Sequence, residues 1–323
     1  MEEVATYRSV SVSQSRKYDP TGTTTLRNLF ARAMSKRFNE LVSTIKKAII
    51  NQDCFGMRKE SIQTHQMSIP GQGAFAFTRS SDKVEAFMKW LQQQIDKGIL
   101  EVTIFQQAGH SVESAWTNLY ILDSYKRAVI RARYELKKAG YDVPSMEQTG
   151  GIAMSMSTPF HMDRVGLLFT RVFSDLKGIT SAMDAQISRV LAQGMADGDG
   201  MMLIARKLVA TINGTEMGEL GITDTLGRFI PAARRAEMLA RTELIRAYAD
   251  ASLQEYKNWG VIGVSADVEF VSSNDDRVCP ECSDLNGQVF TLDEASGVLP
   301  VHVNCRCCWV PYLSDLEKFY NKK

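Results

Sequence analysis

Apolar residues recur at helical spacing along most of this chain. The clearest stripe follows Thr23-Thr24-Thr25, whose hydroxyl groups can cap a helix amino terminus. Its apolar positions fall at steps of three and four residues, which builds one apolar face. They are Leu26, Phe30, Ala33, Met34, Phe38, Leu41, Ile45 and Ile49. The pattern predicts a helix over residues 26–50, preceded by an extended or mobile arm at 1–24.

The same periodicity predicts further helices, separated by segments rich in glycine, proline and small polar residues. Ser81-Asp82 caps the second helix and Gly98 ends it, while Pro231 opens the last helix from a first-turn position. The further predicted helices are 81–98, 114–139, 162 to a break at 194–200, 201–212 and 232–259. Residues 52–81 and 213–229 are predicted to be loops.

Strand-like alternation is confined to short stretches. Residues 266–271 alternate polar and apolar side chains, and a short piece around 102–104 has extended character. Other β structure is not expected before the end of the chain. The predicted fold is mainly α, an elongated helical body followed by a small α+β carboxyl-terminal module. The predicted domains are an arm and helical region at 1–150, a helical domain at 151–262 and the metal-binding module at 263–323.

Composition and charge narrow the class of protein. With 44% hydrophobic and 23% charged residues, the 323-residue chain can bury a core. Its 38 Lys and Arg nearly cancel its 37 Asp and Glu, so the net charge indicates neither a nucleic-acid nor a membrane partner. The longest apolar runs fall short of the ~18 residues that a membrane-spanning helix needs, and Met1-Glu2-Glu3 does not look like a secretory signal. Locally, the predicted helices 26–50 and 114–139 are basic, which fits either contact with DNA or an acidic protein surface, or ordinary solvated faces.

Cysteine spacing predicts a metal site near the carboxyl terminus. Cys279-x2-Cys282 is followed, after nineteen residues, by His302-x2-Cys305-x-Cys307. A C-x2-C turn presents two thiolates on one side, and a second pair about twenty residues later completes a tetrahedral zinc shell. The predicted ligands of a structural zinc ion are Cys279, Cys282, His302 and Cys305, with Cys307 as the alternate. Arg306 and Cys308 should then face away from the ion.

Other chemistry for these cysteines is less well supported. A thioredoxin-like redox pair would need a βαβ setting, and a disulfide would need an oxidising compartment. A metal-dependent nuclease or other hydrolase built on the module is the alternative function. It would need a general-base histidine and an open coordination position. His110 and His161 lie far upstream in polar surroundings and are predicted to be surface residues. We therefore expect no catalytic residues and no enzymatic activity.

Glu243 stands out within the last predicted helix. It lies among small and apolar residues, where a carboxylate is costly without a partner. A planar guanidinium between two metal-binding cysteines could bind it through paired hydrogen bonds. The flanking Arg241 and Arg246 are also candidates, but both can reach solvent from neighbouring faces. The sequence therefore predicts that Glu243 pairs with an arginine, most simply Arg306, and anchors the module to the helix. An exposed glutamate on a mixed surface is the alternative.

The carboxyl-terminal half resembles a known family over about residues 160–315. The similarity is carried by the helices around residues 180–212, by Ala240-Arg241-Thr242-Glu243 and by three runs in the cysteine module. These runs are Asp276-Arg277-Val278-Cys279-Pro280-Glu281-Cys282, Leu285-Asn286-Gly287-Gln288-Val289-Phe290 and Pro300-Val301-His302-Val303-Asn304-Cys305-Arg306-Cys307. They resemble the carboxyl-terminal domain of phage Mu F-like head-morphogenesis proteins. The chain departs from the family at Val301, Val303 and the additional Cys308.

The resemblance implies a minor capsid protein of a tailed bacteriophage. Such a protein is made in the host cytoplasm, lies in the virion inside the head near the portal vertex, and assists head assembly and genome packaging or delivery. Its implied partners are the portal protein and the major capsid protein, with packaged double-stranded DNA as a further candidate and no membrane.

Overall fold

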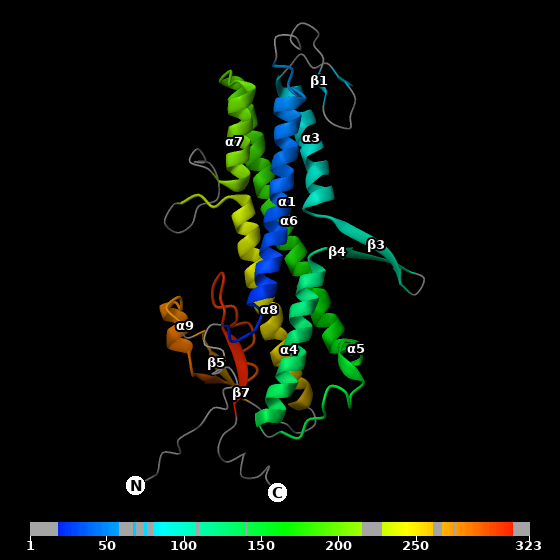
Figure 1. The fold of residues 1–323 in the computed structure, drawn as a ribbon, viewed down its shortest axis with the longest axis vertical. Coiled ribbons are helices and arrows are strands. Elements are labelled where there is room, and N and C mark those ends of the chain that lie inside the picture. Colours follow the sequence, from blue (N-terminus) through cyan, green and yellow to red (C-terminus); the bar gives the residue numbers. More distant parts are fainter. Residues whose placement is uncertain are drawn as a thin grey trace. The chain divides into compact units, whose positions relative to one another are not determined.

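A computed structural model of the chain describes residues 19–57, 67–68, 74–75, 80–107, 110–139, 141–214, 228–260, 267–273 and 275–312. The fold is mainly helical and ends in a small strand-containing module that carries the cysteines and His302 (Figure 1). The predicted fold class is therefore confirmed. Most of the predicted amino-terminal arm, residues 1–18, lies outside the described residues.

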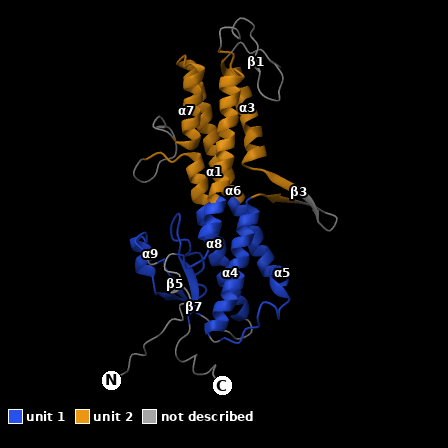
Figure 2. Ribbon diagram, in the orientation of Figure 1, with its two compact units in different colours: residues 1–30, 117–172, 240–323 blue, residues 31–116, 173–239 orange. Residues whose placement is uncertain are grey.

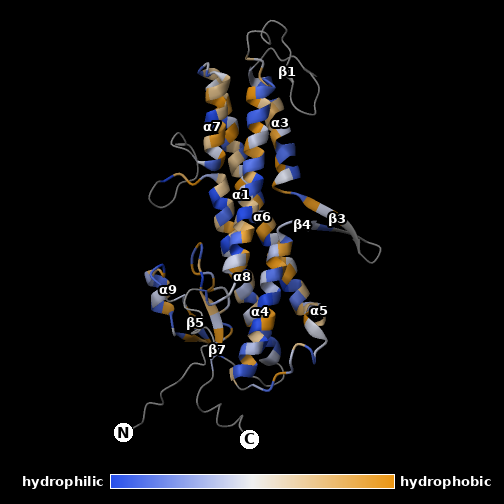
Figure 3. Cartoon of the chain, viewed as in Figure 1, coloured by the Kyte–Doolittle hydropathy of each residue, from blue (hydrophilic) through white to orange (hydrophobic). Residues whose placement is uncertain are grey.

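The helices follow the apolar periodicity closely. They are α1 (Thr24–Lys46), the π-helical turn η2 (Lys47–Asn51), α3 (Ser80–Gly98), α4 (Asn118–Ala139), α5 (Gly151–Met156), α6 (Pro159–Ala196), α7 (Met201–Asn213), α8 (Ala232–Gly260) and α9 (Pro280–Leu285). In α1 the predicted stripe is buried except for the half-buried Ala33. Figure 3 shows hydrophobic and hydrophilic residues interleaved along each long helix, as an amphipathic helix requires. No described helix is both long and apolar enough to cross a membrane.

The prediction that β structure waits until the end of the chain is wrong. β1 (Met67–Ser68) pairs with β2 (Ala74–Phe75) inside the predicted loop 52–81, and β3 (Val102–Gln107) pairs with β4 (His110–Ala115). The predicted helix 114–139 consequently starts later, at Asn118. The physical reason is that residues 111–115 find ladder partners on β3, which local helix propensity cannot anticipate.

The chain separates into two compact units made of non-contiguous segments (Figure 2). Unit 1 comprises residues 1–30, 117–172 and 240–323, and unit 2 comprises 31–116 and 173–239. The unit boundaries fall within or beside the helices α1, α4, α6 and α8. The sequence-based division at residues 150 and 262 stays a prediction.

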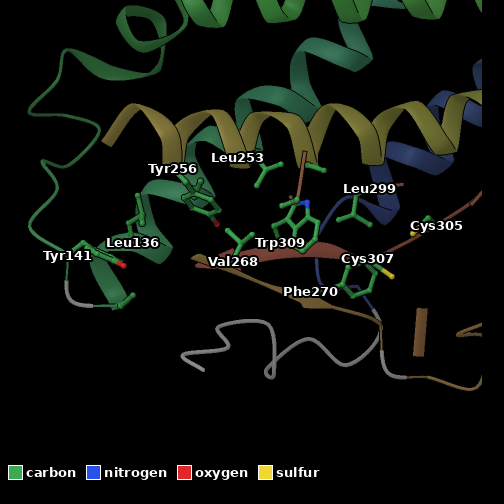
Figure 4. Packing of buried hydrophobic residues seen from close by; sticks show 14 of the residues in the cluster. Leu136, Tyr141, Leu253, Tyr256, Val268, Phe270, Leu299, Cys305, Cys307 and Trp309 are labelled. Carbon is green, nitrogen blue, oxygen red and sulfur yellow. The ribbon is translucent and has the colours of Figure 1, made fainter. Parts of the chain in front are cut away.

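Unit 1 contains the carboxyl-terminal sheet. Its strands β5 (Asp267–Val271), β6 (Val289–Phe290) and β7 (Cys308–Tyr312) are antiparallel in the order β6-β5-β7. The predicted strand 266–271 is thus confirmed as β5. The helix α4 packs against β7. Figure 4 shows buried side chains between α8 and the sheet, with Trp309 next to Leu299 and Phe270 next to Cys307.

Unit 2 is built around aromatic packing and a few specific polar contacts. The Phe87 ring lies 5.1 Å from that of Phe55 and 5.3 Å from that of Trp90. The Arg37 guanidinium lies 4.2 Å from the Trp116 ring centroid and 2.8 Å from the Glu101 carboxylate. These contacts fix the segment that precedes the β3–β4 hairpin.

Candidate metal centre

The first pair of sulfur atoms is placed by the short helix α9. Cys279 is its N-cap residue, and Pro280 occupies the first turn, where its missing N–H costs nothing. The Cys282 backbone N–H donates to the Cys279 Sγ at 3.3 Å. This turn therefore brings both sulfur atoms to the same side of the chain, as the C-x2-C spacing predicted.

The second set of ligands comes from the segment that leads into β7. In the antiparallel pairing, Val271 at the end of β5 lies opposite Cys308 at the start of β7. Residues 305–307, which lead into β7, therefore lie near the segment that follows β5. Cys305 and Cys307 come just before β7, and their sulfur atoms lie within 4.8 Å of one another. Both are buried, at 1% and 3% exposure.

The structure brings five donor groups into two overlapping sets. The ligand atoms of Cys279, Cys282 and His302 lie within 4.8 Å of one another, and those of Cys282, Cys305 and Cys307 do the same. Cys282 belongs to both sets, and its Sγ lies 3.2 Å from the His302 Nε2. All four residues predicted as ligands, together with the alternate Cys307, thus gather in one place. Cys308 lies outside both sets, as predicted.

The thiols of the cluster differ in how readily they ionise. A hydrogen bond from the Cys307 thiol lowers the pKa of Cys305 to about 5, helped by backbone N–H groups and the nearby His302, although burial opposes this. Burial and the adjacent Cys305 raise the pKa of Cys282 to about 12. Without a cation the cluster therefore favours a thiolate at Cys305 and a neutral thiol at Cys282. A divalent cation would relieve the repulsion that opposes further thiolates.

Arg306 lies between the two cysteines and faces the other way, as predicted. Its Nη1 and Nη2 atoms each donate to a different carboxylate oxygen of Asp275, both at 2.6 Å. The Asp275 side chain is only 2% exposed. The hydrogen bonds from Arg306 hold the pKa of Asp275 well below its usual range, against the effect of burial. This bidentate ion pair ties the turn before Cys279 to the segment that carries Cys305 and Cys307.

The prediction that Glu243 pairs with Arg306 is wrong, although Glu243 is buried and does bind arginine. Its carboxylate lies 3.2 Å from the Arg246 Nε and 3.2 Å from the Arg171 Nε. Arg306 instead pairs with Asp275, which belongs to the same carboxyl-terminal module. The acidic residues Asp275 and Asp276, a few positions before Cys279, were the sequence signal that could have identified this pair.

A different contact connects the module to α8. The Asn304 backbone N–H donates to the Thr242 Oγ1 at 3.0 Å. Asn304 has a φ of 62°, a left-handed conformation that asparagine tolerates better than most residues. The turn between His302 and Cys305 is therefore held in place by the residue next to Glu243.

The prediction that His161 is a surface residue is also wrong. His161 is 1% exposed near the start of α6, with its Nδ1 at 2.9 Å from the Tyr125 hydroxyl and its Nε2 at 3.2 Å from Glu255. The Glu255 carboxylate also accepts hydrogen bonds from Arg133 and Trp259. The side chain of His110 cannot be compared with its prediction, because only the backbone of that residue is described.

This buried polar network forms part of the lining of a pocket of about 250 Å³ within unit 1. Met154, Phe160 and Trp259 also line the pocket. Arg133 and His161 each contact the Glu255 carboxylate, so these polar groups link α4, α6 and α8 within the unit. Sequence spacing carried no signal for it, because its members come from three helices.

The protein is mainly helical, and its carboxyl-terminal module carries a cluster of Cys and His side chains that could hold a metal ion. Residues 185–310 match the family model described as Phage Mu protein F like protein. The matched range includes α7, α8, β5, β6, the start of β7 and all five candidate ligands. The resemblance seen in the sequence is therefore confirmed for this part of the chain, and it indicates a phage head-morphogenesis protein. Neither the curated proteins nor the solved structures give a significant match.

Proposed function

We propose that this chain is a minor capsid protein of a tailed bacteriophage that acts at the portal vertex. It assists head assembly and genome packaging or delivery from inside the head, after synthesis in the host cytoplasm. The observation that carries the proposal is the match of residues 185–310 to the Mu F-like family, which includes the helices as well as the cysteine module. The portal protein and the major capsid protein are the proposed partners.

The cysteine module is proposed to hold a structural zinc ion. Sulfur and imidazole donors are those that zinc prefers, and four of them suffice for a closed tetrahedral shell. Cys282, Cys305 and Cys307 are each no more than 3% exposed, which supports a closed site. Cys279, Cys282, His302 and Cys305 are the four proposed ligands, with Cys307 as the alternate for His302. The ion would hold the α9 turn against the segment leading into β7.

Double-stranded DNA stays a candidate partner, but the structure reduces the positive charge available on α4. Arg127 is paired with Asp123, Arg131 with Glu135, and Arg133 with the buried Glu255. Such pairs compete with phosphate for the guanidinium groups. Any DNA binding by the isolated protein is expected to weaken steeply as the salt concentration rises. DNA binding that is independent of salt concentration would contradict contacts to phosphate.

Assembly of procapsids from the portal and major capsid proteins of the same phage tests the proposed function. We expect the full-length chain to co-purify with procapsids in few copies, and to be lost when the portal protein is omitted. Quantitative mass spectrometry of the purified particles measures both outcomes. Equal incorporation with and without portal protein would contradict the proposed location, and complete exclusion from procapsids would contradict the function.

Replacing Asp275 by asparagine is expected to weaken zinc binding about 10–100-fold, the usual effect of removing a group that orients metal ligands. The substituted amide would lack the charge that holds Arg306, and the segment with Cys305 and Cys307 would be less well ordered. Competition with a chromophoric chelator measures the affinity. The matched control is Arg277→Ala, which removes the 69% exposed second partner of Asp275 and should change little. Equal zinc affinity of Asp275→Asn and the wild type would show that the ion pair does not support the site.

A further inference from the structure

The β3–β4 hairpin of unit 2 forms a two-stranded sheet of its own. Six residue pairs join its strands, from Val102↔Ala115 to Gln107↔His110. Figure 1 shows the hairpin projecting from the helices of its unit. Among the described residues β3 pairs with β4 alone, in a two-stranded sheet. An isolated two-stranded hairpin is at best marginally stable in water.

The start of β3 presents apolar side chains to solvent. Ile104 is 63% exposed and Val102 is 37% exposed. In Figure 3 this part of the strand is coloured as hydrophobic. The edge of β3 that does not face β4 also offers unpaired backbone N–H and C=O groups in the described structure. Such an edge is a template for the addition of another strand.

The composition of β3 lacks the features that usually protect an edge strand. Charged residues, proline and bulges block edge pairing in natural proteins. The sequence of β3, Val-Thr-Ile-Phe-Gln-Gln, contains no ionisable residue, no proline and no glycine. The other strand differs, because β4 carries Glu113, the register partner of Ile104. The two edges of the hairpin are therefore unequal, one uncharged and one charged.

We propose that β3 is a self-association edge, which pairs antiparallel with β3 of a second copy of this chain. The uncharged strand can lie against itself about a two-fold axis without opposing like charges, so a second copy fits it without electrostatic cost. The pairing joins two hairpins into a four-stranded sheet. The two β4 strands then form the outer edges, where Glu113 disfavours further addition. The proposal thus specifies a closed dimer and not an open polymer.

The substitution Ile104→Lys tests the proposal on the full-length chain. Lysine at this position can pair with Glu113 within the hairpin, so the hairpin should persist while its edge gains a charge. The matched control is Leu167→Lys, on an α6 side chain that is 57% exposed. Circular dichroism and thermal melting should show both variants folded as the wild type.

Analytical ultracentrifugation over a concentration series gives the main result. We expect the wild type and Leu167→Lys to dimerise, and Ile104→Lys to raise the dimer dissociation constant about 10-fold or more. Hydrogen exchange of the amides at 102–107 should slow as the wild-type concentration rises. A wild-type monomer at all concentrations overturns the proposal, as does a dimer that Ile104→Lys leaves intact. Open-ended aggregation of the wild type would also overturn it. So would slowed hydrogen exchange at residues 102–107 that occurs only when portal protein is added.

Discussion

Replacing Cys282 by serine is expected to abolish metal binding and to unfold the carboxyl-terminal module. Cys282 is the residue shared by the two donor sets, so its loss leaves neither set with three donors. Structural zinc contributes about 10–16 kcal/mol to the folding of isolated zinc fingers. Here the packing of Trp309 and Phe270 supports part of the module without metal. We therefore expect a loss of at least about 4 kcal/mol, large for one substitution.

Urea unfolding followed by tryptophan fluorescence, together with metal analysis, measures this loss. The matched control is Cys308→Ala, since Cys308 is equally buried but lies outside both donor sets. This control should keep the metal and lose only the modest packing energy of one sulfur atom. If Cys282→Ser bound metal as the wild type does, or if both variants lost it equally, the donor sets would be wrong.

Replacing Glu255 by glutamine is expected to cost about 3–5 kcal/mol of folding free energy, because it leaves the Arg133 charge buried without a partner. The Arg133 side chain is 7% exposed, that of Glu255 is 1% exposed, and the pair is 2.8 Å apart. His161 and Trp259 would also lose a charged acceptor. The matched control is Lys257→Gln on the same helix, whose partner Asp293 is 93% exposed. That exposed pair should contribute little to the folding free energy, because solvent screens it.

The effect of Glu255 should also depend on pH. Burial raises its pKa, but hydrogen bonds from His161 and Trp259 and the charge of Arg133 lower it by more, so the folded-state pKa lies below the ordinary glutamate value of 4.5. The ionised carboxylate therefore contributes its full stabilisation above that value and loses it as the pH falls below. The stability difference between wild type and Glu255→Gln should shrink on acidification, measured by urea unfolding at several pH values. A difference that is constant or grows in acid would contradict this assignment.

The parts of the fold that sequence reasoning predicted are those that depend on local pattern. The helix α1 was predicted from one apolar stripe, and α3 from its capping residues and terminal glycine. The β3–β4 hairpin was missed because the strands pair residues that lie far apart in the sequence, such as Val102 and Ala115. Only residues 102–104 had a local pattern that indicated extended structure. The start of α4 was wrong for the same reason.

The candidate site shows the same distinction. The C-x2-C turn and the H-x2-C-x-C run are local, so their spacing alone predicted that the five donors would meet. Spacing could not choose between His302 and Cys307, because both lie within three residues of Cys305 and can reach the same point. The partner of Glu243 and the burial of His161 depend on which helices pack together. The Tyr125–His161–Glu255 network joins three helices, so its members share no sequence motif.

Metal analysis of the purified full-length chain tests the central claim most directly. Plasma mass spectrometry is expected to find a single zinc ion per chain, retained by Cys308→Ala and absent from Cys282→Ser. Exchange for cobalt should give the intense visible absorption of a tetrahedral, thiolate-rich site. A folded wild-type chain that contains no metal, takes up no cobalt and melts at the same temperature with or without a chelator would contradict the account.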